Sequence, residues 1–220
     1  MFPDKKDSGS STQNHLLYTR FNTSFRSMAN MAKYSAVKDE DLVRQITEDH
    51  QTALFDILYE RYHKKVADKS FSLLKNRELS RDAVQAIFIR AFERLAGFRG
   101  EAAFSSWLYT ITYNYCIDFL RKQKQLHYPE WNSLQDLPEI IDEAYEDFEA
   151  FDEELFIRLL DEIHPEEKAL LMMKYHDNIS IRDISIALRI SESAAKMRLK
   201  RARARLLFLY QEVNKQASQE

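Results

Sequence analysis

The chain has 220 residues, of which 45% are hydrophobic, and a formal net charge of −3. No apolar run approaches the roughly 20 residues that span a bilayer, and no signal-peptide segment is present, which argues against a membrane protein and predicts a cytoplasmic location. The single Cys116 excludes an internal disulfide, and its apolar surroundings favour packing over a role as a nucleophile.

Charge is distributed unevenly along the chain. Between positions 127 and 154 there are eleven Asp and Glu and no Lys or Arg, whereas between positions 182 and 205 there are eight Lys and Arg against two acids. An acidic middle and a basic end point to a polyanionic partner such as nucleic acid. The acidic run lacks the ligand spacing and central glycine of a calcium loop, so we expect no metal there.

The fold class follows from only three glycines, four prolines and apolar residues at helical spacing. These features predict an all-α protein with two small helical domains. Residues 1–36 are polar and weakly periodic and indicate a flexible tail, within which Met28 and Met31 are alternative start sites. The rest divides into a first domain (37–125), an acidic linker (126–152), a second domain (153–212) and a short tail (213–220).

Four helices are expected in the first domain. The first opens near Asp39, and the second covers residues 50–75. The third is expected to be capped near Ser80 and to reach residue 95. Gly97 and Gly100 then bracket a turn, and the fourth helix covers residues 105–124.

Four shorter helices are expected in the second domain, at residues 155–163, 166–175, 181–188 and from Ser191 to about residue 210. Pro165 suits the first turn of the second of these helices. Ser180 followed three residues later by Asp183 has capping-box spacing. The last two helices, joined by a short turn, predict a helix-turn-helix.

The last helix has two faces of different chemistry. Apolar residues spaced 4-3-4 form the face predicted to be buried: Ala195, Leu199, Ala202 and Leu206. The opposite face is expected to present Ser193, Lys196, Met197, Lys200 and Ala204, flanked by Arg198, Arg201, Arg203 and Arg205. A helix in the DNA major groove needs side chains that reach base edges and flanking cations on phosphates. The alternative is an ordinary solvated Lys/Arg face.

The order and spacing of several motifs resemble the extracytoplasmic-function (ECF) sigma factors, the two-domain branch of the sigma-70 family. The resemblance covers residues 39–210. In the first domain it rests on Asp41-Leu42-Val43, Phe55-x-x-Leu58-Tyr59-x-x-Tyr62, Asp82-x-x-Gln85-x-x-Phe88-Ile89-x-Ala91-Phe92 and Phe104-x-x-Trp107-Leu108-x-x-Ile111-x-x-Asn114. In the second domain it rests on Ile190-Ser191 and Lys196-x-Arg198-Leu199-x-Arg201-Ala202-Arg203.

This resemblance implies three contacts with the transcription machinery. Residues that match the contact with the clamp helices of the largest subunit of core RNA polymerase are Asp82, Gln85, Phe88 and Ile89. Residues that match capture of the −10 element, including a flipped base, are Phe98, Arg99, Phe104, Thr110, Tyr113, Asn114 and Arg121. Residues expected to read the −35 element are Ser191, Ser193, Lys196, Met197, Arg198, Lys200, Arg201 and Arg203. The second domain would also lie on the flap of the second-largest subunit, and the acidic linker would thread toward the RNA exit path.

The chain departs from the family pattern at several positions. The acids usual before Asp82 are replaced by Ser80 and Arg81, and the Glu usual after Gln85 is Ala86. The glycine usual in the turn of the helix-turn-helix is Arg189, where a left-handed backbone costs about 1 kcal/mol relative to glycine.

Several alternatives stay open at this stage. Phe88, Phe92 and Trp107 are alternatively core residues, and for Trp107 the core is favoured. A free-standing helix-turn-helix regulator and a helical adaptor that binds only protein are the rival functions. No nucleophile–base–acid set, phosphate loop or zinc cluster is recognisable, so we expect neither an enzyme nor a cofactor or metal. The resemblance also implies an anti-sigma factor as a further protein partner.

Overall fold

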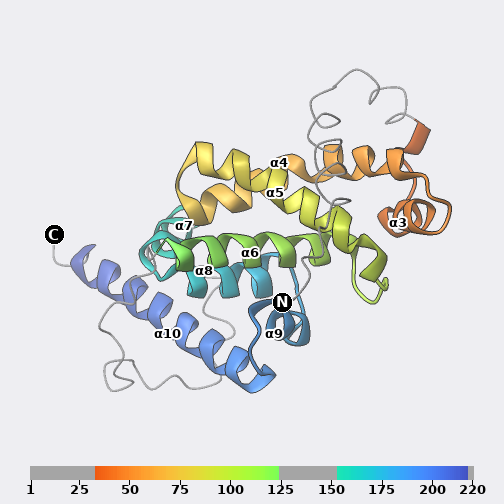
Figure 1. Ribbon diagram of the computed structural model, residues 1–220. Helices are drawn as coiled ribbons and strands as arrows, with labels where there is room; N and C mark the ends of the chain where they lie inside the picture. Colours follow the sequence, from red (N-terminus) through yellow and green to blue (C-terminus); the bar gives the residue numbers. More distant parts are fainter. Residues whose placement is uncertain (1–32, 124–152, 218–220) are drawn as a thin grey trace, which may run out of the picture. The chain divides into compact units, whose positions relative to one another are not determined.

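The computed structural model describes residues 33–123 and 153–217, and Figure 1 labels its helices. Most of the predicted N-terminal tail, the linker predicted at 126–152 and the last three residues lie outside this range. The all-α class is confirmed for the described residues. No helix among them is long and apolar enough to cross a membrane.

The chain forms two compact units. Unit 1 comprises Met1–Asp68 and Asn76–Leu108, and unit 2 comprises Lys69–Lys75 and Tyr109–Glu220. The division falls inside two helices, Phe55–Leu74 and Phe104–Lys122. The last residues of the first helix, from Lys69, and most of the second, from Tyr109, therefore belong to unit 2 together with the C-terminal helices.

The N-terminal half of the described chain is helical apart from short connections. Its elements are α3 (Asp39–Thr47), η1 (Thr52–Leu54), α4 (Phe55–Leu74), α5 (Arg77–Arg94), η2 (Leu95–Gly97) and α6 (Phe104–Lys122). The helix predicted at 50–75 begins later than expected, because His50 has a left-handed backbone with φ of 56° and a 3-10 turn precedes α4.

The start of α5 corrects the expected cap at Ser80. The cap lies four residues earlier, where the side chain of Asn76 accepts a hydrogen bond of 3.0 Å from the backbone N–H of Leu79. Ser80 is buried inside the helix and its hydroxyl donates to the carbonyl of Asn76. Asn is as good an N-cap as Ser, and Lys75 with φ of 52° separates α5 from α4.

Aromatic rings from α4 and α5 build the core of unit 1. Phe55 packs edge-on against Phe92 with ring centroids 5.0 Å apart, and Tyr59 packs in the same way against Phe88 at 4.7 Å. Phe55 and Phe88 are almost completely buried. Such pairs add directional packing to the burial of apolar area.

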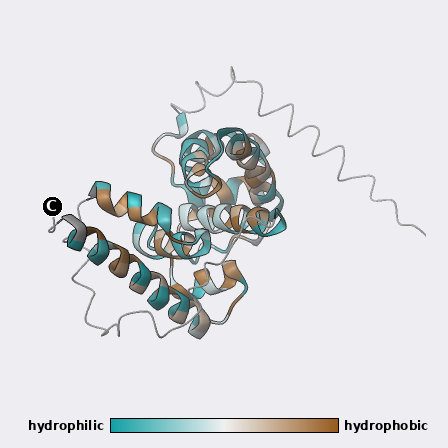
Figure 2. Ribbon diagram, turned by 90° about the vertical axis from the view of Figure 1, so that its left-hand side faces the viewer, coloured by the Kyte–Doolittle hydropathy of each residue, from teal (hydrophilic) through white to brown (hydrophobic). Residues whose placement is uncertain are grey.

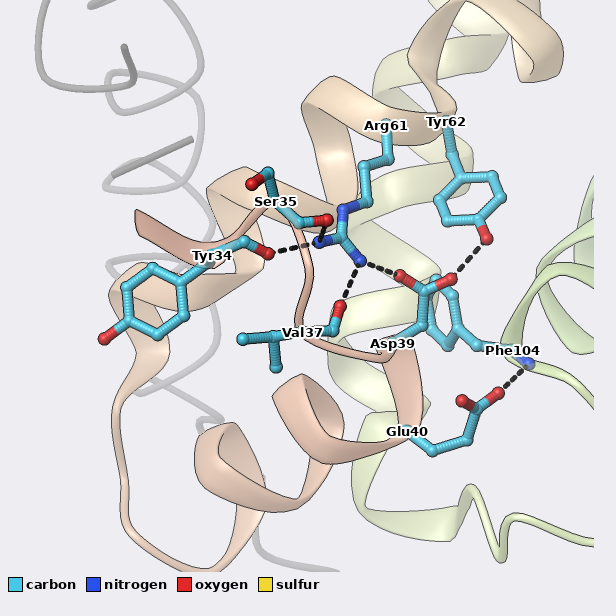
Figure 3. A network of polar contacts seen from close by, with 8 residues as sticks. All are labelled: Tyr34, Ser35, Val37, Asp39, Glu40, Arg61, Tyr62 and Phe104. Atoms are coloured by element: carbon cyan, nitrogen blue, oxygen red, sulfur yellow. Dashed lines mark hydrogen bonds and ion pairs between the residues drawn. The ribbon is translucent and has the colours of Figure 1, made fainter. Parts of the chain in front are cut away.

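Arg61 of α4 fastens the segment that leads into α3, as Figure 3 shows. Its guanidinium donates to the backbone carbonyls of Tyr34 at 2.6 Å and Val37 at 2.9 Å, and it pairs with the carboxylate of Asp39. The second oxygen of Asp39 accepts a hydrogen bond from the hydroxyl of Tyr62. The chain is therefore held in place from Tyr34 onward, two residues before the expected end of the tail.

Replacing Asp39 with Ala should lower the free energy of unfolding by about 2 kcal/mol, because the guanidinium of Arg61 and the buried hydroxyl of Tyr62 lose a charged acceptor. Asp41 provides the matched control, since it lies in the same first turn of α3 but pairs only with exposed Arg44. Asp41→Ala should cost less than about 1 kcal/mol. Chemical denaturation of the two variants measures both values, and equal losses would contradict the role given to Asp39.

The C-terminal helices of unit 2 are α7 (Glu153–Glu162), α8 (Pro165–Leu171), η5 (Met172–His176), α9 (Ile181–Leu188) and α10 (Glu192–Ala217). The helix predicted at 166–175 is α-helical only as far as Leu171 and continues as a π turn. The last helix extends to Ala217, beyond the expected end at residue 210. Cys116 of α6 is completely buried, and burial raises the pKa of its thiol to about 12, which fits packing.

His164 caps α8 with its imidazole. The Nδ1 atom accepts from the backbone N–H of Glu166 at 3.2 Å, and Pro165 occupies the first turn as predicted. Burial lowers the pKa of His164 below its ordinary value of 6.5, against the opposing charge of Glu166. The neutral ring is the form that accepts the capping hydrogen bond, so the fold favours it.

The unfolding free energy should therefore fall as the pH is lowered from 7.5 to 5.5. The folded-state pKa of His164 lies below the unfolded value, so the unfolded chain binds more protons in this window. His164→Asn keeps a capping oxygen but does not titrate, and it should show a smaller loss. Urea unfolding of both proteins at the two pH values tests this, and equal losses would show that other groups carry the pH dependence.

Candidate nucleic-acid interface

The helix-turn-helix forms from residues that cap both of its helices. The hydroxyl of Ser180 accepts from the backbone N–H of Asp183 at 3.1 Å and donates to the carboxylate of Asp183 at 2.6 Å. Ser191 accepts from the N–H of Ala194 at 3.2 Å at the start of α10. Both predicted caps are confirmed, and the carboxylate of Asp183 accepts from the capping hydroxyl itself.

The turn between α9 and α10 places Arg189 in the left-handed region, with φ of 56° and ψ of 46°. The N–H of the next residue, Ile190, donates to the carbonyl of Ser185 at 3.0 Å, which closes the end of α9. This backbone favours glycine, so the strain expected at Arg189 is present.

Arg189→Gly should raise the free energy of unfolding by up to about 1 kcal/mol, because glycine adopts this backbone without a Cβ clash. Arg189→Ala removes the same side chain but keeps the clash, so it should leave stability nearly unchanged. Thermal and urea unfolding compare the two variants. Equal stabilisation by both variants would show that the arginine side chain, and not the backbone clash, lowers the stability.

Helix α10 buries one face and exposes another, and in Figure 2 teal and brown alternate along the helix that leads to the C-terminus. Its predicted inner residues are buried: Ala195, Leu199, Ala202 and Leu206. Its first three turns expose Ser193, Lys196, Met197, Lys200 and Arg201. A row of cations and adaptable side chains therefore lies near the start of the helix.

Ala204, expected on the outer face, and Arg203, expected on its flank, are both buried. Ala204 is 2% exposed and Arg203 is 9% exposed. The prediction of an exposed Arg203 that contacts phosphate is wrong in this structure. The physical reason is that α10 packs against α7 and α8 as well as α9, so apolar surroundings extend around more than one side of the helix.

Two other flanking arginines are paired with acids of α8. Arg205 contacts the carboxylate of Glu167 at 2.9 Å, and Arg198 lies 3.7 Å from a carboxylate oxygen of Glu166. Burial raises the pKa of Glu167, and the charge of Arg205 opposes this. Arg205 is therefore a packing residue, whereas Arg198 is still partly exposed.

A second cluster surrounds the turn before α6. The rings of Phe98 and Trp107 lie 5.5 Å apart, and Phe104 lies 5.8 Å from Phe98. Phe98 and Trp107 are partly exposed, whereas Phe104 is completely buried. Gly100, with φ of 69°, allows the turn, and a carboxylate oxygen of Glu40 accepts from the N–H of Phe104 at 3.1 Å (Figure 3).

Known proteins match both halves of the chain. Residues 58–125 match the family model for Sigma-70 region 2, and residues 153–206 match that for Sigma-70, region 4. The chain is 26% identical over 149 residues to the ECF RNA polymerase sigma factor SigX of Bacillus subtilis, covering 64% of this chain and 76% of that protein. It is 31% identical over 152 residues to SigM, an ECF RNA polymerase sigma factor of Mycobacterium tuberculosis, covering 69% and 74%.

The chain belongs to the ECF sigma factors of the sigma-70 family. A solved structure of CnrH in complex with the cytosolic domain of CnrY shares its fold, with a TM-score of 0.52 and 20% identity. That match covers 79% of this chain and 97% of CnrH.

The sigma factor exposes only part of the face expected to bind core polymerase. Asp82 and Gln85 are exposed on α5, and Ile89 is half-buried on the same helix. Phe88 is completely buried between the aromatic rings of α4 and α5, so its alternative assignment as a core residue is the correct one.

The residues expected to hold the −10 element are divided between exposed and buried positions. Arg99 and Arg121 are exposed, and Phe98, Thr110 and Asn114 are partly exposed. Phe104 and Tyr113 are completely buried, so contact of either ring with a base is wrong for this structure. Trp107, for which the core was favoured, is partly exposed beside Phe98.

Three charged residues of unit 2 were not predicted from the sequence: Lys69, Glu166 and Asp177. Their side chains are only 7%, 6% and 3% exposed. One signal was available, since Lys69 falls between Val66 and Leu73 at spacings of three and four, on the apolar stripe of α4. A charge at such a position needs a buried partner.

Proposed function

We propose that this sigma factor binds core RNA polymerase and directs it to promoters by reading −10 and −35 elements. We further propose that it acts in the cytoplasm and has no enzymatic activity of its own. The observation that carries the proposal is the exposed row of cations at the start of α10, in a chain that also matches region 2. The fold relative CnrH is solved with the cytosolic domain of CnrY, and we extend that to a protein partner that restrains this sigma factor.

The −35 element is read by the exposed face of α10. Lys196 and Lys200 are four residues apart on this helix, and both are exposed near its N-terminal end, the part that reaches base edges in helix-turn-helix proteins. Arg201 lies to the side, where it contacts phosphate. Ser191, Ser193, Met197 and Arg198 complete the surface, while Arg203 supports it from inside.

The −10 element is held around the turn before α6. The partly exposed rings of Phe98 and Trp107 offer an apolar wall on which an unstacked base can lie. Phe104 supports both rings from the core. Arg99, Thr110, Asn114 and Arg121 supply polar and cationic groups for base edges and phosphates.

Core polymerase is bound through the exposed part of α5. Asp82 and Gln85 lie three residues apart, on one face of the helix, and Ile89 extends the same face by one turn. The single acid at Asp82, without the neighbouring acids usual in the family, reduces the charge of this contact.

Replacing Lys196 and Lys200 together with Ala should reduce promoter-dependent transcription by at least about 10-fold, since each base contact is worth about 1–3 kcal/mol. The matched control is Lys215→Ala, because Lys215 is an exposed cation near the far end of α10 that pairs with Glu212. Run-off transcription with core polymerase and a selected promoter library measures the effect.

Arg201→Ala should weaken promoter binding evenly across sequences and flatten the salt dependence of that binding.

DNA binding without polymerase, core binding and transcription together separate the rival functions. Tight binding to palindromic duplex DNA without polymerase would indicate a free-standing regulator. Full activity of the Lys196 and Lys200 variant would indicate an adaptor that binds protein alone. Absence of both core binding and a promoter-dependent transcript in the unmodified protein would refute the proposed function.

A further inference from the structure

Met197 is a large apolar residue on a part of α10 whose surface is otherwise polar. It is 49% exposed, and the other large apolar residue exposed on the described part of this helix is Val213, at 38%. Val213 lies about four turns further on, a distance of about 24 Å along the helix axis. A single exposed apolar residue is common on protein surfaces, so its neighbours decide what it can bind.

The residues around Met197 carry hydrogen-bonding groups. In its first three turns, and within an arc of about 100° around its axis, α10 exposes Ser193, Lys196, Met197 and Lys200. The hydroxyl of Ser193 lies 3.0 Å from the hydroxyl of Ser191, the residue that caps the helix. Ser193 therefore interacts with the cap, and the surface beyond it consists of Met197 with a lysine before and after it.

The major-groove edges of the bases offer one apolar group among their hydrogen-bonding atoms. That group is the 5-methyl of thymine, whereas guanine presents two acceptors, adenine an acceptor and a donor, and cytosine a donor. A lysine ammonium donates hydrogen bonds and therefore suits the acceptors of guanine. A methionine side chain has no donor and only a weakly accepting sulfur, but it is flexible and adapts to an apolar surface.

We infer that Met197 selects thymine in the −35 element by packing against its 5-methyl group, next to bases whose acceptors bind Lys196 and Lys200. The inference rests on the proposed function, which places the first turns of α10 in the major groove. It adds the base that this position selects and the atom that is recognised. The lysines then supply hydrogen bonds to polar edges, and Met197 supplies the contact that no hydrogen bond can replace.

Uracil in place of thymine tests this inference, because it lacks the 5-methyl group but keeps every hydrogen-bonding atom. The probe is a promoter duplex selected with the unmodified sigma factor and core polymerase. Each thymine of its −35 element is replaced in turn, on both strands, and the −10 element is left unchanged. We expect uracil at one position to weaken binding of the complete holoenzyme by about 4-fold, the effect of burying one methyl group.

Three variants identify the side chain that senses the methyl group. Met197→Ala should bind the thymine and uracil duplexes equally, whereas Met197→Leu keeps an apolar contact and should retain the preference for thymine. The matched control is Val213→Ala, which removes an exposed apolar side chain from the far part of the same helix and should also retain it. Each preference is a ratio of two affinities of one protein, so changes in core binding cancel from the comparison.

Loss of the thymine preference in Met197→Ala, with retention in Met197→Leu and Val213→Ala, would support the inference. Equal binding of both duplexes by the unmodified protein would overturn it, as would a selected −35 element without thymine. An unchanged preference in Met197→Ala would also overturn it, and weaker core binding by that variant would then assign Met197 to a protein contact. Failure of the proposed function is distinct, because the unmodified holoenzyme would then select no promoter duplex.

Discussion

Each unit depends on one Asp whose charge is shared between a cation and a tyrosine hydroxyl. In unit 1, Asp39 binds Arg61 and Tyr62, and in unit 2, Asp177 binds Lys69 and Tyr113. A carboxylate removed from water must be compensated by hydrogen bonds and opposite charge, and both groups meet that requirement with partners distant in sequence. The first holds the entry to α3, and the second joins the end of α4 and α6 to the C-terminal helices.

The same requirement explains why the basic character of the C-terminal region is only partly available at its surface. Glu167 of α8 holds Arg205 in the interior, where it supports the packing of α10, and Glu166 lies close to Arg198, which stays partly exposed. Lys196, Lys200 and Arg201 remain exposed near the start of α10. Counting Lys and Arg along the sequence therefore overstates the number of cations at this surface. The count does not distinguish cations that are buried in the fold from cations that remain exposed.

Local sequence patterns predicted caps and turns correctly where contacts between residues close in sequence determine the structure. The Ser180 and Ser191 caps and the left-handed Arg189 depend on contacts within a few residues, so their residue types were sufficient. The start of α5 was misplaced because Asn76 and Ser80 are both good caps and only the reversed backbone at Lys75 selects between them. The π turn after Leu171 had no local signal.

The sequence by itself determined the helical class, the family, the helix-turn-helix and the apolar stripe of α10, because these follow from spacing along one helix and from ordered motifs. Only the tertiary structure decided which members of those motifs face inward. Phe88, Phe104, Tyr113 and Arg203 are buried, since neighbouring helices cover faces that the period of one helix leaves unassigned. The bonds of Glu166 and Asp177 to α4 and α6 were also beyond the sequence, because they join residues 45 to 108 positions apart.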